Sequence, residues 1–170
     1  MRQLGRYPCV LSIYPNTRGF AFVVFERSLS PIDWGIKHVR RPQKNAGCVA
    51  KARSIIERYR PSILILQDTF SDGVRRSRRI RQLNESIAEL AAADEIPVCA
   101  YTRDEVVAAF SGFGIRNKRD VALVIARNIP AFERYVPPPR RPWMSEDDRM
   151  GLFDAAALAL TFFKTPEDKK

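Results

Sequence analysis

The sequence predicts an α/β fold with a mixed β-sheet of about five strands flanked by helices, and two observations indicate this class. Three apolar, β-prone runs come first, separated by short turns, which is typical of antiparallel strands in hairpins. Apolar runs then alternate with segments of helical periodicity, which is typical of parallel strands connected by helices. The expected strands are 9–13, 19–25, 32–39, 63–66 and 97–101, and the expected helices are 46–59, 74–93, 103–110, 118–128 and 145–163.

The strands are indicated by continuous apolar runs and by the turns between them. Pro15 and Asn16 interrupt the apolar sequence between 9–13 and 19–25 and predict the turn of a hairpin. The run Ile63–Leu66 has no polar position, as expected for a strand that is buried on both faces of a sheet.

The helices are indicated by apolar residues that recur every three or four positions, as they do within 74–93. The last helix is expected to begin at Ser145, whose hydroxyl has the capping-box spacing to Asp148, and to run to Phe163. A stiff, proline-rich connector at 137–142 precedes it.

Length and composition indicate one globular domain, 1–170, with a core at about 9–163. Apolar residues make up 45% of the chain, which excludes a disordered basic tail. The 29 Lys and Arg against 19 Asp and Glu give a net charge of +10, which favours a polyanionic partner such as nucleic acid. No apolar run approaches the roughly 18 residues of a membrane span, so no membrane partner is expected.

Cysteine and histidine are too few for several common kinds of site. The three cysteines include no C-x-x-C pair, so a disulfide framework or a thiolate zinc site is not expected, and a reducing cytoplasm is the predicted location. His38 is the only histidine, so any metal site would have to be built from carboxylates.

Arginines cluster just after the fourth predicted strand, and we expect them to contact nucleic acid. The planar guanidinium suits bidentate contacts to phosphate, and the alternative is a solvated helix face. The cluster consists of Arg75, Arg76, Arg78, Arg79 and Arg81.

Four segments, in order, resemble the RuvC-type Holliday-junction resolvases of the ribonuclease-H-like superfamily. The first is the turn Ile13-Tyr14-Pro15-Asn16-Thr17-Arg18-Gly19, and the second runs from Pro61 to Gln67. The third leads from the strand 97–101 through a glycine-containing turn to Lys118, and the fourth is Gly151–Ala159. The resemblance covers about residues 9–163. It implies a ribonuclease-H-like sheet, DNA as a partner and, because relatives dimerise, a homodimer.

The same resemblance identifies four positions at which the family carries acids. Its chemistry requires four carboxylates that hold two divalent cations, Mg²⁺ or Mn²⁺, at a phosphodiester. This chain has Tyr14, Gln67, Gly151 and Asp154 at those positions, so one acid remains. We therefore expect a degenerate site with weak or absent nuclease activity and no cofactor, unless Mg²⁺ or Mn²⁺ is held by a rebuilt site.

Asp68 and Asp147 are the candidates for rebuilding a catalytic site with Asp154, which would also be its metal ligand. Asp68 follows Gln67, so strand alternation points it to the other face. Asp147 is seven residues before Asp154, which is about 10 Å along a helix axis. Arg18, Lys118 and Arg119 complete the predicted nucleic-acid contacts.

Three functions remain open. The first is a nucleic-acid-binding RuvC-like domain that binds branched or duplex DNA with weak or no nuclease activity. The second is an active metal-dependent junction endonuclease with relocated carboxylates. The third is a structural or partner-binding domain. Under the resemblance, Tyr14, Gln67 and Asp154 should meet at one site.

Overall fold

A computed structural model describes residues 9–71 and 75–165, and its centre is a five-stranded mixed sheet. The strand order is β3-β2-β1-β4-β5. β1 pairs antiparallel with β2 and parallel with β4, so the predicted α/β class with a mixed sheet is confirmed. The strands are β1 (Val10–Pro15), β2 (Gly19–Arg27), β3 (Ser30–His38), β4 (Ile63–Gln67) and β5 (Val98–Tyr101).

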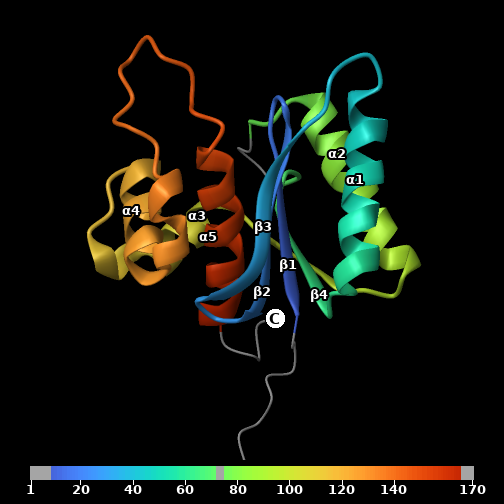
Figure 1. Ribbon diagram of the computed structural model, residues 1–170, viewed down its shortest axis with the longest axis horizontal. Helices are drawn as coiled ribbons and strands as arrows, with labels where there is room; N and C mark the ends of the chain where they lie inside the picture. The colour runs from blue at the N-terminus through green and yellow to red at the C-terminus, as the bar shows by residue number, and fades with distance from the viewer. Residues whose placement is uncertain (1–8, 72–74, 166–170) are drawn as a thin grey trace, which may run out of the picture.

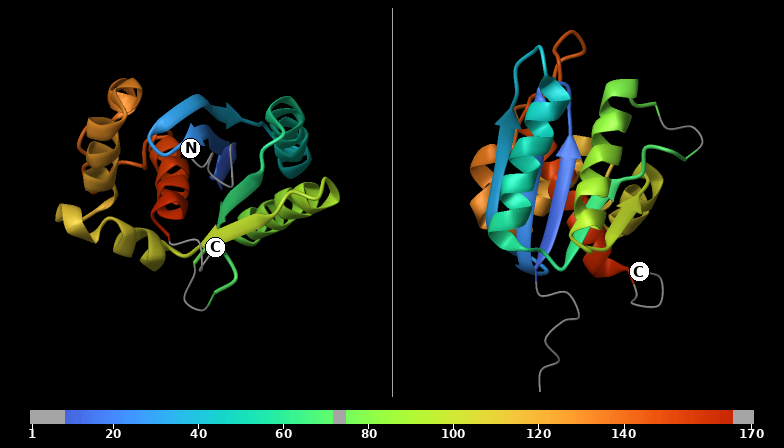
Figure 2. Two further views of the ribbon diagram at one scale, coloured as in Figure 1. Left: turned by 90° about the horizontal axis from the view of Figure 1, so that it is seen from below. Right: turned by 90° about the vertical axis from the view of Figure 1, so that its right-hand side faces the viewer.

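Helices cover both faces of this sheet (Figure 1). α1 (Lys44–Tyr59) and α2 (Arg78–Ala93) lie on one face, and the remaining helices lie on the other, as the view along the sheet in Figure 2 shows. That second layer contains α3 (Arg103–Ala109), α4 (Lys118–Asn128), α5 (Met150–Lys164) and the 3₁₀ helices η1 (Ser111–Phe113) and η2 (Pro130–Tyr135).

The strand register brings the chemistry-bearing ends of β1 and β4 together. Ser12 of β1 lies opposite Ile65 of β4, and the two strands are parallel. Two residues further along each strand, the register carries Tyr14 to the level of Gln67. The carboxyl ends of both strands therefore open at the same edge of the sheet, next to the beginning of α5.

The position of α5 follows from its small residues. Ala155, Ala156, Ala157 and Ala159 are buried, and their short side chains let the helix lie close to the sheet. The Ser12 hydroxyl donates a 2.7 Å hydrogen bond to the carbonyl of Ala155. This contact fixes the helix against β1, one residue from Asp154.

Two predicted helix starts were wrong. The last helix begins at Met150 rather than Ser145, because Asp147 accepts hydrogen bonds from both the backbone N–H and the side chain of Arg149 and holds the chain in a turn. α2 begins at Arg78 rather than residue 74, because the Ser77 hydroxyl caps it by accepting from the N–H of Ile80.

The two 3₁₀ helices, η1 and η2, were not predicted from the sequence.

Within 9–71 and 75–165, no helix is both long enough and apolar enough to cross a membrane.

Candidate functional site

A cavity of about 540 Å³ opens at the carboxyl ends of β1, β4 and β5. Tyr14, Gln67 and Asp154 all line it, so the three positions meet at one site as expected. Four basic side chains line the same cavity. Two of them contact these three residues: Arg76 bonds to Tyr14 and Gln67, and Lys118 forms an ion pair with Asp154.

Arg76 is held at the strand ends by neutral acceptors. Its Nη1 donates to the Tyr14 hydroxyl at 2.7 Å and to Oε1 of Gln67 at 3.0 Å, and its Nη2 donates to the carbonyl of Pro15. The guanidinium also lies 4.9 Å from the centre of the Tyr14 ring, which is a cation–π distance. Among the described residues no carboxylate forms an ion pair with Arg76, so its positive charge is uncompensated by direct contact.

Lys118 is the second cation of the cavity, and it begins α4. Its Nζ lies 3.3 Å from Oδ2 of Asp154, 3.1 Å from Oε1 of Glu146 and 5.7 Å from the centre of the Tyr14 ring. Burial opposes the charged form, but Asp154, Tyr14 and Glu146 outweigh it and raise the pKa of Lys118. The ammonium group is therefore a permanent positive charge at this site.

Asp154 is the one acid at the four positions given by the resemblance, and it is nearly buried. Its side chain is 16% exposed, and burial raises its pKa to about 6, against the lowering effect of Lys118. Burial and the nearby Asp154 raise the pKa of Tyr14, so the phenol is neutral at physiological pH. At neutral pH Asp154 is mainly ionised and forms an ion pair with Lys118.

Gly151 lies one helical turn before Asp154 and faces the turn between β1 and β2. A Cβ atom at this position would lie 3.1 Å from Nδ2 of Asn16 and 3.4 Å from Cβ of Ala21. The first distance is tighter than ordinary contact, so a larger side chain would require Asn16 to move.

The carboxylates proposed as replacements lie elsewhere. Asp68 accepts hydrogen bonds from the backbone N–H groups of Phe70 and Ser71 and from the Ser71 hydroxyl, which lowers its pKa. Asp147 binds Arg149, and this contact lowers the pKa of Asp147. Neither side chain lines the cavity that contains Asp154.

Several of the predicted nucleic-acid contacts already bond within the fold, although one of them, Arg18, is still largely exposed. Arg79 donates to Oδ1 of Asn45 at 3.0 Å and to the carbonyl of Asn16 at 2.9 Å. Arg18 forms a 2.8 Å ion pair with Asp148, and Arg119 reaches the connector carbonyl of Pro137. The exposed members of the arginine cluster are Arg75, Arg78 and Arg81.

Sequence reasoning missed the residues of the site that follow β5. Thr102, Arg103 and Asp104 line the cavity directly after this strand. Their position was a usable signal, because the carboxyl ends of neighbouring parallel strands meet at one edge of a sheet.

The residues of the cavity do not fit a pair of divalent cations. Such a site requires several carboxylates around the two ions, and here the lining has two, Asp154 and Asp104, of which only Asp154 stands at one of the four positions given by the resemblance. Two fixed cations, Arg76 and Lys118, lie among those positions instead. Across the part of the chain that the structure describes, no three His, Cys, Asp or Glu side chains are grouped to hold a metal ion.

Comparisons with known proteins agree with the architecture. No protein-family model matches the sequence. The chain is 35% identical over 77 residues to the crossover junction endodeoxyribonuclease RuvC of Rhodococcus jostii (strain RHA1). That match covers 45% of this chain and 41% of the relative, so it spans less than half of the relative's length.

Solved structures match over nearly the whole chain. RuvC of T. thermophilus in complex with a Holliday junction substrate superposes with a TM-score of 0.64 and 21% identity, covering 90% of this chain and 91% of that one. The yeast mitochondrial Holliday junction resolvase Ydc2 gives a TM-score of 0.60 and 13% identity, covering 91% of this chain and 77% of that one. These structural matches show that the chain has the fold of the RuvC and Ydc2 resolvases, and the partial sequence match to a RuvC is consistent with that fold.

Proposed function

We propose that this chain binds branched DNA at the edge where β1 and β4 end, and that it does not cleave that DNA by a two-metal mechanism. The observation that carries the proposal is the replacement of an acidic metal pocket by one in which Arg76 and Lys118 lie among the family's acid positions. Positive charge at this place repels divalent cations and attracts the phosphate backbone.

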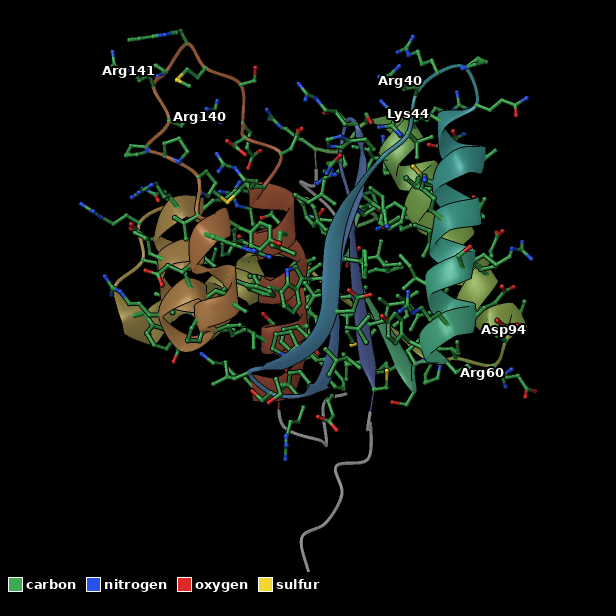
Figure 3. The ribbon with its side chains drawn as sticks, viewed as in Figure 1. Arg40, Lys44, Arg60, Asp94, Arg140 and Arg141 are labelled. Atoms are coloured by element: carbon green, nitrogen blue, oxygen red, sulfur yellow. The ribbon has the colours of Figure 1, made fainter. Side chains whose placement is uncertain are left out.

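The distribution of basic side chains supports the choice of partner. Figure 3 shows Arg40 and Lys44 at one side of the sheet edge and Arg140 and Arg141 at the other, at the same end of the molecule as the beginning of α5. The labelled Arg60 lies at the opposite end. A basic surface that flanks a cavity on two sides suits a polyanion wider than a single strand.

The segment between η2 and α5 adds an aromatic group to this surface. Trp143 is 75% exposed, and the guanidinium of Arg141 lies 5.5 Å from its ring. An exposed indole beside basic residues can stack on a base that is unpaired at a branch point. Trp34, by contrast, packs edge-on against Phe132, so it belongs to the core.

Binding and cleavage are tested separately. A labelled four-way junction and a duplex of equal length are titrated with the protein in EDTA, and we expect saturable binding with tighter affinity for the junction. The junction is then incubated with protein in Mg²⁺ or Mn²⁺, and we expect it to stay intact. Absence of binding would favour the structural or partner-binding domain.

Cleavage by the wild type, abolished in Asp154→Asn, would overturn the non-cleaving proposal. It would favour the endonuclease with relocated carboxylates, which would then have to recruit Asp68 or Asp147 from positions outside the cavity. Homodimerisation and a cytoplasmic location stay predictions.

A further inference from the structure

We propose that the cavity at the strand ends binds a phosphate group of the nucleic-acid backbone directly, through side-chain cations and without a metal ion. The inference deepens the proposed function and rests on it for the source of the phosphate. The chemistry of the cavity itself is argued from its contacts and charges.

Basic groups outnumber acidic groups in the wall of this cavity. The basic side chains number four and the acidic side chains two, so the lining has an excess of two positive charges. A half-buried concavity with excess positive charge concentrates oxyanions. The charged lining residues are Arg75, Arg76, Arg103, Lys118, Asp104 and Asp154.

Arg76 is the charge centre of the cavity, because its neighbour Lys118 is already neutralised by Asp154 and Glu146. A guanidinium has five N–H donors. Arg76 gives three of them to Tyr14, Gln67 and the Pro15 carbonyl, and no acceptor in the described chain takes the other two.

The bonds that Arg76 does make orient it for a ligand. Its acceptors come from the adjacent ends of β1 and β4, so the guanidinium is fixed before any ligand arrives. Because these acceptors are neutral, they fix the group without cancelling its charge. A fixed planar donor with two open N–H groups suits a phosphate, which accepts paired hydrogen bonds from arginine.

Inorganic pyrophosphate is the probe for the cavity, and isothermal titration calorimetry in EDTA is the measurement. We expect saturable binding by the wild type, weakened tenfold or more in Arg76→Gln, because a charge-assisted contact is worth about 1.5–3 kcal/mol. The matched control is Arg53→Gln, which removes an exposed arginine from α1, outside the cavity. Binding that needs Mg²⁺, or that Arg76→Gln leaves unchanged, would overturn the proposal.

A second variant separates loss of charge from loss of structure. Gln67→Glu places a carboxylate where Oε1 now lies 3.0 Å from Nη1 of Arg76, so it should form an ion pair and compete with the anion. We expect this variant to melt no lower than the wild type and to bind pyrophosphate at least tenfold more weakly. Unchanged pyrophosphate affinity in a folded Gln67→Glu protein would contradict the proposal.

Competition identifies the source of the phosphate. Pyrophosphate should displace a four-way junction from the wild type, and Arg76→Gln should make the junction complex insensitive to pyrophosphate at the same concentration. Pyrophosphate binding without displacement would overturn the assignment to DNA backbone. If the protein binds pyrophosphate but no DNA, the proposed function fails while the anion cavity stands.

Discussion

At the scale of single residues, two side chains, Arg76 and Lys118, place positive charge in the cavity. In a pocket of carboxylates, bound metal ions would provide that positive charge. Restoring acids alone should therefore fail to restore a metal site. The triple variant Tyr14→Asp, Gln67→Glu, Gly151→Asp tests this. The carboxylates at positions 14 and 67 would form ion pairs with Arg76 and Lys118. The side chain at position 151 would press on Asn16, because a Cβ atom there lies 3.1 Å from Nδ2 of Asn16.

We expect this triple variant to bind Mn²⁺ no better than the wild type in an electron paramagnetic resonance titration. Adding Arg76→Ala should create measurable Mn²⁺ affinity, because it removes the guanidinium that the first two acids would otherwise neutralise. Tight Mn²⁺ binding by the triple variant alone would show that Arg76 leaves the pocket readily. The single variant Arg76→Ala is the control, since it opens space without adding ligands.

Asp154 predicts a pH dependence of stability with a definite sign. Burial raises its pKa to about 6, above the ordinary value of 3.8. Lys118 and Arg76 lower this pKa, and Glu146 raises it, but burial has the largest effect. Between about pH 4 and pH 6 the folded state holds the proton more tightly than the unfolded state, so the free energy of unfolding should decrease as the pH rises and level off above pH 6. The decrease is on the order of 3 kcal/mol.

Urea unfolding at several pH values measures this decrease, and Asp154→Asn should remove it. Asp68→Asn is the matched control. The contacts from Ser71 and Phe70 lower the pKa of Asp68, so its contribution changes only below about pH 4. A decrease that persists in Asp154→Asn would assign the titration to another group.

At the scale of elements, the sequence predicted every strand and most helices, because each has a strong apolar pattern. Ile63–Leu66 forms all of β4 except its last residue, Gln67, and the hairpin at Pro15 and Asn16 is the β1–β2 turn. The predicted start of α5 at Ser145 was wrong, because Asp147 accepts hydrogen bonds from the backbone N–H and the side chain of Arg149, and the helix begins at Met150. Local competition between side chains and backbone leaves no periodic signal.

The candidate site shows the same limit. The meeting of Tyr14, Gln67 and Asp154 followed from strand order, because topology alone brings these ends together. The position of Arg76 did not follow from strand order, because this residue precedes α2 in an irregular segment. The direction of its side chain depends on three acceptors at the ends of β1 and β4. A cluster of arginines in a sequence does not distinguish the member that points inward from its exposed neighbours.

The segment between η2 and α5 makes a prediction of its own. Trp143 is 75% exposed, so Trp143→Ala should leave the melting temperature unchanged. Stacking on a base contributes about 1–3 kcal/mol, so affinity for a four-way junction should fall by roughly fivefold to a hundredfold. Trp143→Phe, which keeps an aromatic face, should retain most of the affinity. Equal losses in the Ala and Phe variants would exclude stacking as the contact.

At the scale of the whole molecule, part of the net charge of +10 lies at one end of the molecule. The basic groups at the end where β1 and β4 terminate come from the β3–α1 connection, the segment before α2 and the segment before α5. Three separate segments thus contribute basic side chains at the end of the molecule where the cavity lies. A polyanion bound there would neutralise several charges at once and release the counterions of its own phosphates.

Salt dependence tests this surface. Affinity for a four-way junction should fall linearly with salt on a double-logarithmic plot, with a slope of about 0.9 for each phosphate neutralised. Replacing Arg75, Arg78 and Arg81 with Ala should weaken binding and flatten the slope by up to about 3. These three side chains are exposed, so their loss should not disturb the fold, whereas Arg76 and Arg79 also hold the β1–β2 turn.

The control variant replaces Lys51, Arg53 and Arg58 of α1 with Ala, which removes the same charge from exposed positions of another helix. If both variants flatten the slope equally, net charge alone governs binding, and the arginine cluster is not the contact surface.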